Sequence, residues 1–489
     1  MSVEKQQIRK EPIPKVVKKE GFLQQVRKKF PVDDKPFSYW LEKNHYYHHR
    51  LKKFYRFSVP EGARVLALQC KNGYLLDAVR PTYGVGIDND PAMITQAKEA
   101  YPRYHFYAGT LADLSLNETF DYVLLSSVTM DTYDVQSLFE ALKPFCHAGT
   151  RLVLDTFTTA WEPLLWCAQK LGIRRQTVFK NRLSLDDIEN LLHLADFEVV
   201  NRSRFMLMPV YVPFFSTICN TILKHVPLLD RFCLHRSLVA RPMFKERRFD
   251  EHAVSIIIPC RNEKGNIEEA VKRTPQLGAC TELIFVEGNS HDGTLEEIKR
   301  VKAAYPERSI SYYVQSGKGK ADAMRLGFDR AIGDIVMILD GDLTMPPEEL
   351  PKFYYALINN KGECINGSRM VYVMENGAMQ VLGFAANYFF GRICSWLLGQ
   401  KVKDTLCGTK VLWKEDYDAI ARNRTFFGNF DPFGDFDLLF GAAKLNLKII
   451  DMPVHYKNRT YGTTQIRKFY CLWILLAMCV IACKRFKLR

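Results

Sequence analysis

Two aspartates separated by a single glycine, Asp340 and Asp342, directly follow the apolar run at residues 335–339. A strand of that composition is expected to end there, where both carboxylates can converge on one hard cation while Gly341 leaves room for a ligand. Mg²⁺ or Mn²⁺ held by one or two carboxylates and completed by substrate phosphates is a usual arrangement for diphosphate chemistry. Taken alone, the pair is more typical of a solvated turn, so its interpretation depends on the surrounding segments.

The segments before this pair alternate strands with helices. A β-branched strand from residue 254 runs into a Pro-x-x-Asn-Glu sequence, a second strand ends at residue 287, and a third leads through a Gly/Lys loop into a helix. Such alternation predicts a parallel, doubly wound sheet, whose ligand site lies at the carboxyl ends of its strands. The residues that stand out at those ends are Pro259, Asn262, Glu263, Glu287, Lys318 and Lys320.

The first half of the chain shows the same pattern. A strand begins near Arg64, a turn at Gly73 opens a helix, and a second strand closes at Asp88. Further strand and helix segments follow as far as residue 157, which predicts another doubly wound sheet. The expected fold class is therefore α/β, with two Rossmann-like doubly wound domains and an apolar C-terminal helix.

The 489 residues suffice for two or three domains, and an apolar share of 47% with a charged share of 25% is that of a folded globular protein. A polar connector separates the two α/β patterns. The predicted organisation is a basic N-terminal segment at 1–35, a first α/β domain at 36–244, a linker at 245–253, a second α/β domain at 254–466 and an apolar helix at 467–489.

The net charge of +14 is concentrated at the two ends of the chain. Residues 1–56 carry 15 Lys/Arg against 6 Asp/Glu, and residues 452–489 carry 8 Lys/Arg and no acidic residue. Basic ends indicate an anionic partner, either a membrane or nucleic acid, with a solvated tail as the alternative for residues 1–35. Thirteen Cys without paired spacing, and the lack of a secretory signal, favour reduced thiols in a cytosolic compartment.

The C-terminus favours a membrane over nucleic acid. Residues 469–483 are fifteen consecutive apolar residues between basic flanks. A helix of this length extends roughly 22 Å, short of the ~30 Å hydrocarbon core, so it suits an interfacial or re-entrant position, with a buried terminal helix as the alternative. Residues 201–240 are also rich in Phe, Leu, Met and Pro, and either pack between the domains or rest on a membrane. The expected location is the cytoplasmic side of a membrane.

The first α/β segment resembles class I S-adenosylmethionine-dependent methyltransferases over roughly residues 36–240. Its strand, glycine turn, helix and acidic residue at the end of the second strand follow the order of that family. The resemblance implies that the loop with Gly73 wraps the methionine part of the cofactor and that Asp88 binds its ribose hydroxyls.

The cofactor loop departs from the family pattern Leu-Gly-Cys-Gly-x-Gly. Gln69 and Lys71 stand where two of the glycines are expected, and Thr110 replaces a usual acid. Side chains at these positions take up space that the cofactor needs, and a cation is unfavourable near a sulfonium. Either S-adenosylmethionine binds in a modified pocket or the domain is a scaffold without catalysis, and we favour the scaffold. A histidine cluster without further metal ligands is interpreted as part of a lid helix: His45, His48 and His49.

The second α/β segment resembles family 2 glycosyltransferases with a GT-A fold, in the branch of dolichyl-phosphate mannose synthase, over nearly all of residues 254–466. Six motifs match in order: PCRNE, VEGNSHDGT, LDGDLTMPPE, INGSRM, KDTLCGTKVLWKED and RTYGTTQI. Two departures are Glu287, where an Asp is usual, and Gly288, where a second Asp is usual. Lys410 stands where the branch usually has Arg, which exchanges a planar fork for a point charge.

The resemblance implies a role for each motif residue. Asp340 and Asp342 would hold Mg²⁺ or Mn²⁺, and Asp404, Arg369 and Asp342 would be the catalytic group. Arg369 and Lys410 would bind the acceptor phosphate, and Asp437 would lie beside the sugar, with a helix cap as the alternative. The nucleotide-sugar pocket would be formed by Pro259, Asn262, Glu263, Glu287, Lys318, Asp340 and Arg459.

The implied reaction is transfer of a sugar, with inversion, from a nucleotide sugar to a polyprenyl phosphate. A phosphate monoester is mostly dianionic at neutral pH, so it needs no strong base, and Asp404 is then an organiser of the acceptor site. Two alternatives stay open: a transferase acting on a soluble glycan or protein, and a bifunctional enzyme with an active methyltransferase.

Overall fold

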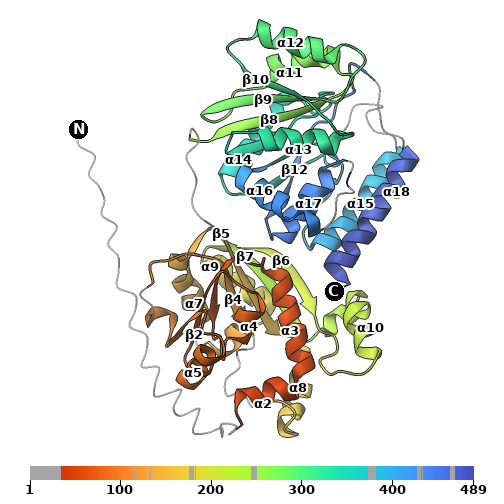
Figure 1. Ribbon diagram of the computed structural model, residues 1–489. Helices are drawn as coiled ribbons and strands as arrows, with labels where there is room; N and C mark the ends of the chain where they lie inside the picture. Colours follow the sequence, from red (N-terminus) through yellow and green to blue (C-terminus); the bar gives the residue numbers. More distant parts are fainter. Residues whose placement is uncertain are drawn as a thin grey trace, which may run out of the picture.

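The structure is a computed structural model that describes residues 35–113, 116–132, 134–175, 181, 183–243, 251–372, 381–426, 431, 433–462 and 468–488. Almost all of the basic N-terminal segment and most of the linker at 245–253 lie outside the described residues. Figure 1 shows two α/β units, one above the other, with a pair of long helices along one side of the upper unit.

The first unit is built on a seven-stranded sheet in the order β3-β2-β1-β4-β5-β7-β6. The strands β1 to β5 are parallel to one another, while β7 is antiparallel to both β5 and β6. The strands are β1 (Arg64–Leu68), β2 (Tyr83–Asp88), β3 (His105–Ala108), β4 (Phe120–Ser126), β5 (Cys146–Phe157), β6 (Phe197–Phe205) and β7 (His235–Pro242).

Helices cover both faces of this sheet, with apolar clusters on each side of it. The helices are α2 (Phe37–Lys43), α3 (His45–Ser58), α4 (Tyr74–Ala78), α5 (Pro91–Ala100), α6 (Val128–Asp131), α7 (Val135–Leu142), α8 (Glu162–Lys170), α9 (Leu185–Leu194) and α10 (Phe215–Thr221).

The second unit has a seven-stranded sheet in the order β10-β9-β8-β11-β13-β12-β14. The pairs β10–β9, β9–β8, β8–β11 and β12–β14 are parallel, and β13 is antiparallel to β11 and β12. The strands are β8 (Ala253–Cys260), β9 (Cys280–Glu287), β10 (Ser309–Val314), β11 (Ile335–Ile338), β12 (Cys364–Ser368), β13 (Lys410–Trp413) and β14 (Ile449–Pro453).

The helices of the second unit also lie on both faces of its sheet. They are α11 (Ile267–Arg273), α12 (Thr294–Ala304), α13 (Lys320–Arg330), α14 (Leu350–Ile358), α15 (Val381–Leu398), α16 (Lys414–Arg422), α17 (Asp435–Lys444) and α18 (Lys468–Ala482). The predicted α/β class with two Rossmann-like units is therefore confirmed. The sheets differ from the expected parallel form in having one strand each, β7 and β13, that runs against its neighbours.

The strand β7 explains part of the segment at 201–240. The antiparallel pair of β6 and β7 uses residues 197–205 and 235–242, and the chain between them leaves the sheet and forms α10. Alternating polar and apolar residues in β6 and a short apolar run in β7 give a weak periodic signal over so short a length. Their pairing is fixed by the sheet edge that β5 offers.

The two units meet at an interface that contains buried charges. Arg151 of β5 donates to both carboxylate oxygens of Glu363 at 2.7 and 2.8 Å and to the carbonyl oxygen of Asn446 at 2.7 Å. Arg241 of β7 lies 3.5 Å from the same carboxylate and donates to Asn360. Both guanidinium groups are almost completely buried. Such bidentate pairs fix orientation, so the first unit is held against the start of β12.

The helices α15 and α18 lie side by side along the second unit (Figure 1), and their inner residues join its core. The predicted apolar C-terminal segment is thus helical over Lys468–Ala482, followed by a π-helical turn at Cys483–Lys487. Among the described residues, no helix combines the length and the apolar character needed to cross a membrane.

Candidate active site

The first aspartate of the opening pair makes an ion pair with a lysine from the neighbouring helix. Lys320, the first residue of α13, donates to Asp340 at 2.6 Å just beyond the end of β11. Burial alone would raise the pKa of Asp340, but Lys320, together with Lys410 and Arg369, lowers that pKa. The same contact raises the pKa of Lys320. Both side chains are only partly exposed, so this is a fixed pair of opposite charges at the carboxyl edge of the sheet.

The second aspartate is paired with an arginine that comes from the far end of the domain. Arg459 donates one nitrogen to Asp342 at 2.6 Å and another to Glu263 at 2.8 Å. Thr344 donates its backbone N–H and its hydroxyl to the other oxygen of Asp342. Arg459 therefore bridges the loop after β8 and the loop after β11, and these two strands are adjacent in the sheet.

Glu263, the second carboxylate that Arg459 contacts, has a raised pKa. Burial, together with the nearby Asp342, raises the pKa of Glu263 to about 7, although Arg459 and Asn266 act to lower it. Asn266 donates to its second oxygen at 2.7 Å. A buried carboxyl beside another carboxylate is expected to ionise with difficulty until more positive charge arrives.

The donor set at Asp340 and Asp342 fits a hard divalent cation. Both supply carboxylate oxygens, which Mg²⁺ and Mn²⁺ prefer, and such ions usually take only one or two protein carboxylates beside phosphate and water. Within the described residues there is no group of three or more His, Cys, Asp or Glu side chains that could form a metal site by protein ligands alone. Any Cβ at Gly408 would overlap the Asp340 carboxylate, so the backbone passes close to it.

The loops after β8 and β9 are tied to each other. Asn262, with φ of 55°, accepts from the His291 backbone N–H at 2.9 Å and donates its own N–H to the Ser290 hydroxyl. Glu287, at the end of β9, accepts the N–H groups of Ser290 at 2.6 Å and Asn289 at 3.1 Å. The carboxyl of Glu287 thus shapes the turn in this conformation, and it is buried.

Gly341, the residue between the two aspartates, lies close to the backbone of β8. A Cβ at Gly341 would lie 2.8 Å from the carbonyl oxygen of Pro259, so no larger residue is accommodated without a shift. This contact places Pro259 directly behind the aspartate pair. The sequence predicts a glycine here to leave room for a ligand, which stays a prediction; the close approach that the structure shows is to the backbone of β8.

A second charged group lies at the carboxyl end of β12. Arg369 donates to Asp404 through its side chain at 2.7 and 2.9 Å and through its backbone N–H at 3.0 Å. Asn387 of α15 and the backbone N–H of Leu406 also donate to Asp404. Tyr456 stacks its ring below the Arg369 guanidinium, with 5.1 Å to the ring centre.

These contacts keep Asp404 ionised. Burial would raise its pKa, but Arg369 outweighs burial and lowers the pKa of Asp404 to about 2. Its two oxygens already accept five hydrogen bonds, and its side chain has no exposed surface. A carboxylate in this state orients Arg369 and is a poor proton acceptor.

Lys410 and Asp437 are both held in internal ion pairs. Lys410 of β13 is fully buried and donates to Asp435 at 2.8 Å and to the carbonyl oxygen of Cys407 at 2.6 Å. Asp437, in the first turn of α17, accepts from Arg424 at 2.7 Å. In this conformation Lys410 contacts no open surface, and its role in acceptor binding stays a prediction.

One of the two lysines of the Gly/Lys loop contacts the aspartate pair. Lys318 is exposed, whereas Lys320 reaches Asp340. Four further contacts were not foreseen from the sequence: those made by Asn387, Asp435, Tyr456 and Asp431. Asp431 caps α17 by accepting the N–H groups of Phe436 and Asp437. Asp431 lies outside the N-cap position of α17, which Gly434 occupies, so no cap pattern in the sequence indicated it.

The corresponding edge of the first sheet is occupied by its own side chains. Gly73 has a φ of 80° and precedes α4. Asp88, at the end of β2, accepts the backbone N–H groups of Lys71 at 2.8 Å and Asp90 at 2.9 Å. Burial raises the pKa of Asp88 in spite of these bonds. The carboxylate expected to bind a ribose thus already holds the loop that replaces the glycine loop.

An aromatic cluster covers this loop. Lys71 has its ammonium 5.3 Å above the ring of Phe37 on α2, and Phe37 packs against Tyr74 and His48. His48 of α3 hydrogen-bonds the Tyr74 hydroxyl at 3.3 Å. Burial, with Lys71 nearby, lowers the pKa of His48 to about 3, so its ring is neutral at ordinary pH.

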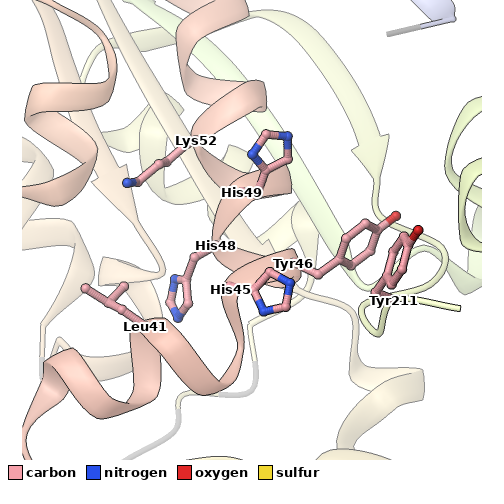
Figure 2. A pocket seen from close by; sticks show the side chains of 7 residues that line it. All are labelled: Leu41, His45, Tyr46, His48, His49, Lys52 and Tyr211. Carbon is pink, nitrogen blue, oxygen red and sulfur yellow. The ribbon is translucent and has the colours of Figure 1, made fainter. Parts of the chain in front are cut away.

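A pocket of about 570 Å³ opens on the outer side of α3 (Figure 2). Figure 2 shows His45 and His49 on the same helix as His48, with Tyr46 turned toward Tyr211. Neither Gly73 nor Asp88 lines this pocket, so it does not coincide with the place expected for the cofactor. The set of residues around it is Leu41, His45, Tyr46, His48, His49, Lys52 and Tyr211.

The end of β5 carries a polar network whose centre is buried. Asp155 accepts from Tyr55 at 2.5 Å and pairs with His235 at 2.8 Å, and the other ring nitrogen of His235 lies 3.0 Å from the Tyr47 hydroxyl. Asp155 and His235 have no exposed surface. Every polar group of this row therefore has a partner inside the domain, including two from α3.

The sequence was compared with protein-family models. Residues 255–420 match the model for glycosyl transferase family 2, and residues 66–154 match the model for a methyltransferase domain. The first range contains β9, β10, β11, β12 and β13 with most of β8 of the second sheet, and the second range contains β2, β3 and β4 with most of β5 and part of β1 of the first.

Two curated proteins are similar to the second half. A dolichol-phosphate mannosyltransferase of Pyrococcus furiosus is 37% identical over 223 residues, covering 44% of this chain and 59% of that protein. An undecaprenyl-phosphate 4-deoxy-4-formamido-L-arabinose transferase of Aeromonas hydrophila is 33% identical over 111 residues, covering 22% of this chain and 34% of that protein. The chain thus spans less than two thirds of the length of these curated relatives.

Solved structures resemble each half at low identity. A glucosyl-3-phosphoglycerate synthase from Mycobacterium tuberculosis, solved with Mn²⁺ and uridine diphosphate, is 18% identical with a TM-score of 0.35, covering 48% of this chain and 80% of that one. A putative methyltransferase complex of Haloferax volcanii is 16% identical with a TM-score of 0.34, covering 44% and 100%. The family matches and the strand orders identify the chain as one that joins a methyltransferase-type domain to a glycosyltransferase family 2 domain.

Proposed function

We propose that the chain is an inverting, metal-dependent glycosyltransferase that moves a sugar from a nucleotide sugar to a polyprenyl phosphate at the cytoplasmic face of a membrane. The observation that carries this proposal is the group of charges just after β11, in which Asp340 pairs with Lys320 and Asp342 pairs with Arg459. Two carboxylates and two cations at the carboxyl edge of a doubly wound sheet suit a diphosphate and its counter-ion.

A divalent cation fits the carboxylates of Asp340 and Asp342, and it would supply positive charge to the diphosphate leaving group. Lys320 and Arg459, which now neutralise these carboxylates, would then be within reach of phosphate oxygens. Glu263, whose pKa lies at about 7, stays beside Arg459 and keeps its guanidinium oriented. The charged side chains after β11 are therefore paired with one another, and in the proposed complex the substrate and the cation would replace these partners.

The reaction needs no proton acceptor on the protein. One oxygen of the acceptor phosphate forms a bond to the anomeric carbon from the side opposite the leaving group. The bond from that carbon to the nucleoside diphosphate breaks, and the electron pair leaves with the diphosphate. Arg369 is positioned by Asp404 to bind the acceptor phosphate, and the low pKa of Asp404 agrees with an orienting role.

The choice of acceptor rests on the relatives. The names of both curated proteins include a polyprenol phosphate, dolichol phosphate in one and undecaprenyl phosphate in the other. Such an acceptor resides in a bilayer, and the basic, apolar helix α18 supports a membrane location for the enzyme.

The test is a panel of nucleotide sugars incubated with the full chain, a short polyprenyl phosphate and Mg²⁺ or Mn²⁺. Formation of a glycosyl phospholipid that depends on the divalent cation supports the proposal. Transfer to soluble glycans or peptides, with none to the lipid phosphate, contradicts it, as does full activity in the presence of EDTA.

The methyltransferase-type domain is proposed to be a scaffold. Asp88 holds the Lys71 loop, Phe37 covers that loop, and the row at Asp155 is internally satisfied. At the same time Arg151 binds Glu363 at the start of β12, the strand that leads to Arg369. These contacts support a role in holding the acceptor site, and direct titration with S-adenosylmethionine tests it.

A further inference from the structure

The segment at residues 207–229 carries a helix whose polarity is reversed. A surface helix of a soluble domain normally turns its apolar side to the core. Phe214, which immediately precedes α10, and Phe215 and Ile218 on α10 are all exposed, and Phe214 is 86% exposed. So large an exposed aromatic and aliphatic surface on one short segment calls for a partner.

The inward side of the same segment is polar and well bonded. Asn220 is completely buried, donates to the Met208 carbonyl oxygen at 2.7 Å and to the Tyr46 hydroxyl at 3.0 Å, and accepts the Met208 N–H. Ser216, also buried, donates to the Val212 carbonyl oxygen at 2.8 Å. These hydrogen bonds hold the polar side of the segment against the protein, so the apolar side chains on its other side face outward.

The segment is continuous with the helix pair of the second domain. His225, at the end of the segment, lies 2.7 Å from the carbonyl oxygen of Lys487 in the turn after α18, and its ring meets Trp396 of α15 edge-on at 5.8 Å. Figure 1 shows α10 directly below the end of α18. The two domains thus contribute to a single surface.

The helix pair exposes apolar side chains of its own. On α15, Tyr388, Phe389 and Trp396 are exposed, and on α18 Leu472 and Trp473 are exposed, with Trp473 at 73%. Together with the exposed residues of 207–229 they form what we term the apolar face. Tyr and Trp, with an apolar body and a polar tip, are the aromatic residues that favour a membrane interface.

The apolar face lacks negative charge in its sequence. Residues 207–229, 381–398 and 468–488 contain no Asp or Glu. Lys484 and Arg485, in the turn after α18, are exposed at its border. Apolar residues bordered by cations, with no carboxylate, complement an anionic bilayer surface.

We propose that the apolar face lies in the interface of an anionic lipid bilayer, and that the methyltransferase-type domain supplies the second of its two membrane contacts through residues 207–229. The inference deepens the proposed function, on which its lipid acceptor rests. It gives the first domain a task that needs no cofactor: it fixes the enzyme on the membrane in one orientation.

The face is also connected to the acceptor site. Asn387 lies on α15 next to the exposed Tyr388, and it donates to Asp404 at 2.8 Å, which in turn binds Arg369. One helix thus separates the proposed acceptor arginine from the proposed membrane surface. A phosphate at the head of a membrane lipid would reach Arg369 without leaving the interface.

The experiment measures binding of the full chain to vesicles of phosphatidylcholine with phosphatidylglycerol, by co-sedimentation. The double variant Phe214→Ser/Ile218→Ser, which alters only outward side chains, is expected to lower the partition coefficient about tenfold or more. Ile332→Ser is the matched control, because Ile332 is 84% exposed but lies after α13, outside the three segments of the face. It is expected to bind as the unmodified chain does.

Further readouts separate the possible outcomes. Equal vesicle binding by the double variant overturns the inference, as does a loss of self-association by that variant in analytical ultracentrifugation, which would assign the face to a second copy. Transfer to a short, water-soluble prenyl phosphate is expected to stay unchanged while transfer to vesicle-embedded lipid falls. If no protein transfers sugar to either acceptor but vesicle binding still falls tenfold, the proposed function fails and the membrane surface stands.

Discussion

The two domains share the order of four parallel strands but differ in the contacts that charged side chains make at the carboxyl edge of the sheet. Both sheets contain four strands in the parallel arrangement 3-2-1-4, as β3-β2-β1-β4 and β10-β9-β8-β11. At the carboxyl edge of the second sheet, charged side chains meet as Lys320–Asp340 and Arg459–Asp342 pairs, partly exposed. At the edge of the first, Asp88 is bonded to its own loop backbone.

The difference lies in what a ligand would have to displace. In the second domain it exchanges one ionic partner for another, which is nearly balanced in energy. In the first it would have to remove Phe37 from its place over the Lys71 loop and leave buried polar groups without partners. A shared fold therefore does not imply a shared activity, and the predictions below test this contrast.

The largest effect is expected from Asp342→Asn. It removes one of the two carboxylates of the proposed cation site, so sugar transfer should fall at least about 100-fold, measured with labelled nucleotide sugar. Asp88→Asn, the same substitution at the carboxyl edge of the first sheet, should leave transfer within about twofold. Comparable losses in both variants, with unchanged melting temperatures, would erase the contrast between the two edges.

A smaller loss of transfer is expected from Arg369→Lys. The bidentate contact with Asp404 and the stacking on Tyr456 are specific to a guanidinium, so transfer should fall roughly 10- to 100-fold. Because Arg369 is proposed to bind the acceptor, the KM for polyprenyl phosphate should rise while that for the nucleotide sugar stays constant. The reverse pattern would move Arg369 to the donor side.

The interface between the domains can be tested by Arg151→Met. Removing this guanidinium leaves Glu363 buried without its bidentate partner, which costs about 3 kcal/mol and should lower the melting temperature by roughly 5 °C. Arg64→Met, which breaks the exposed pair with Glu118, should change it by less than about 1 °C. The double variant Arg151→Met/Glu363→Leu should recover part of the loss. If Arg151→Met melts like the unmodified chain, the two domains are not held by this pair.

The smallest effect is expected in the first domain. Isothermal titration of the full chain with S-adenosylmethionine up to about 1 mM should give no binding heat, since the loop and aromatic cluster fill the expected position. A competent methyltransferase with S-adenosylmethionine and the same protocol provides the positive control. Saturable binding in the micromolar range would show that this cleft accepts a ligand, and the scaffold role would have to be abandoned.

The sequence was informative where a signal is local. Strands ending at Asp88, Glu287 and just before Asp340 could be predicted, because apolar runs and the turns after them lie next to one another in the chain. The contact of Gly341 with the carbonyl oxygen of Pro259 could not be predicted, because Pro259 in β8 and Gly341 after the neighbouring β11 lie far apart in the chain. The fold class followed from such signals, whereas the identity of both domains followed from the resemblance of their motifs to known families.

The partners of the charged groups could not be predicted. Lys410 pairs with Asp435, 25 residues away, and Arg151 pairs with Glu363, 212 residues away. Such contacts depend on how sheets and domains pack, for which the residues themselves carry no local pattern. The same holds for Lys320 rather than Lys318 at Asp340, a choice made by the first turn of α13. The reversed polarity of α10 was open for the same reason.

The strand β12 joins two of these distant contacts. Glu363, bound by Arg151 of the first domain, immediately precedes it, and Arg369 immediately follows it. Five residues of extended chain cover only about 16 Å, and no turn lies between the two ends to absorb a displacement. A chain cut between the domains would thus lose the Arg151–Glu363 contact at the start of β12, even though each half keeps a complete sheet. We therefore expect the two domains to evolve as a unit, since neither can be exchanged for that of a homologue without matching the other at this strand.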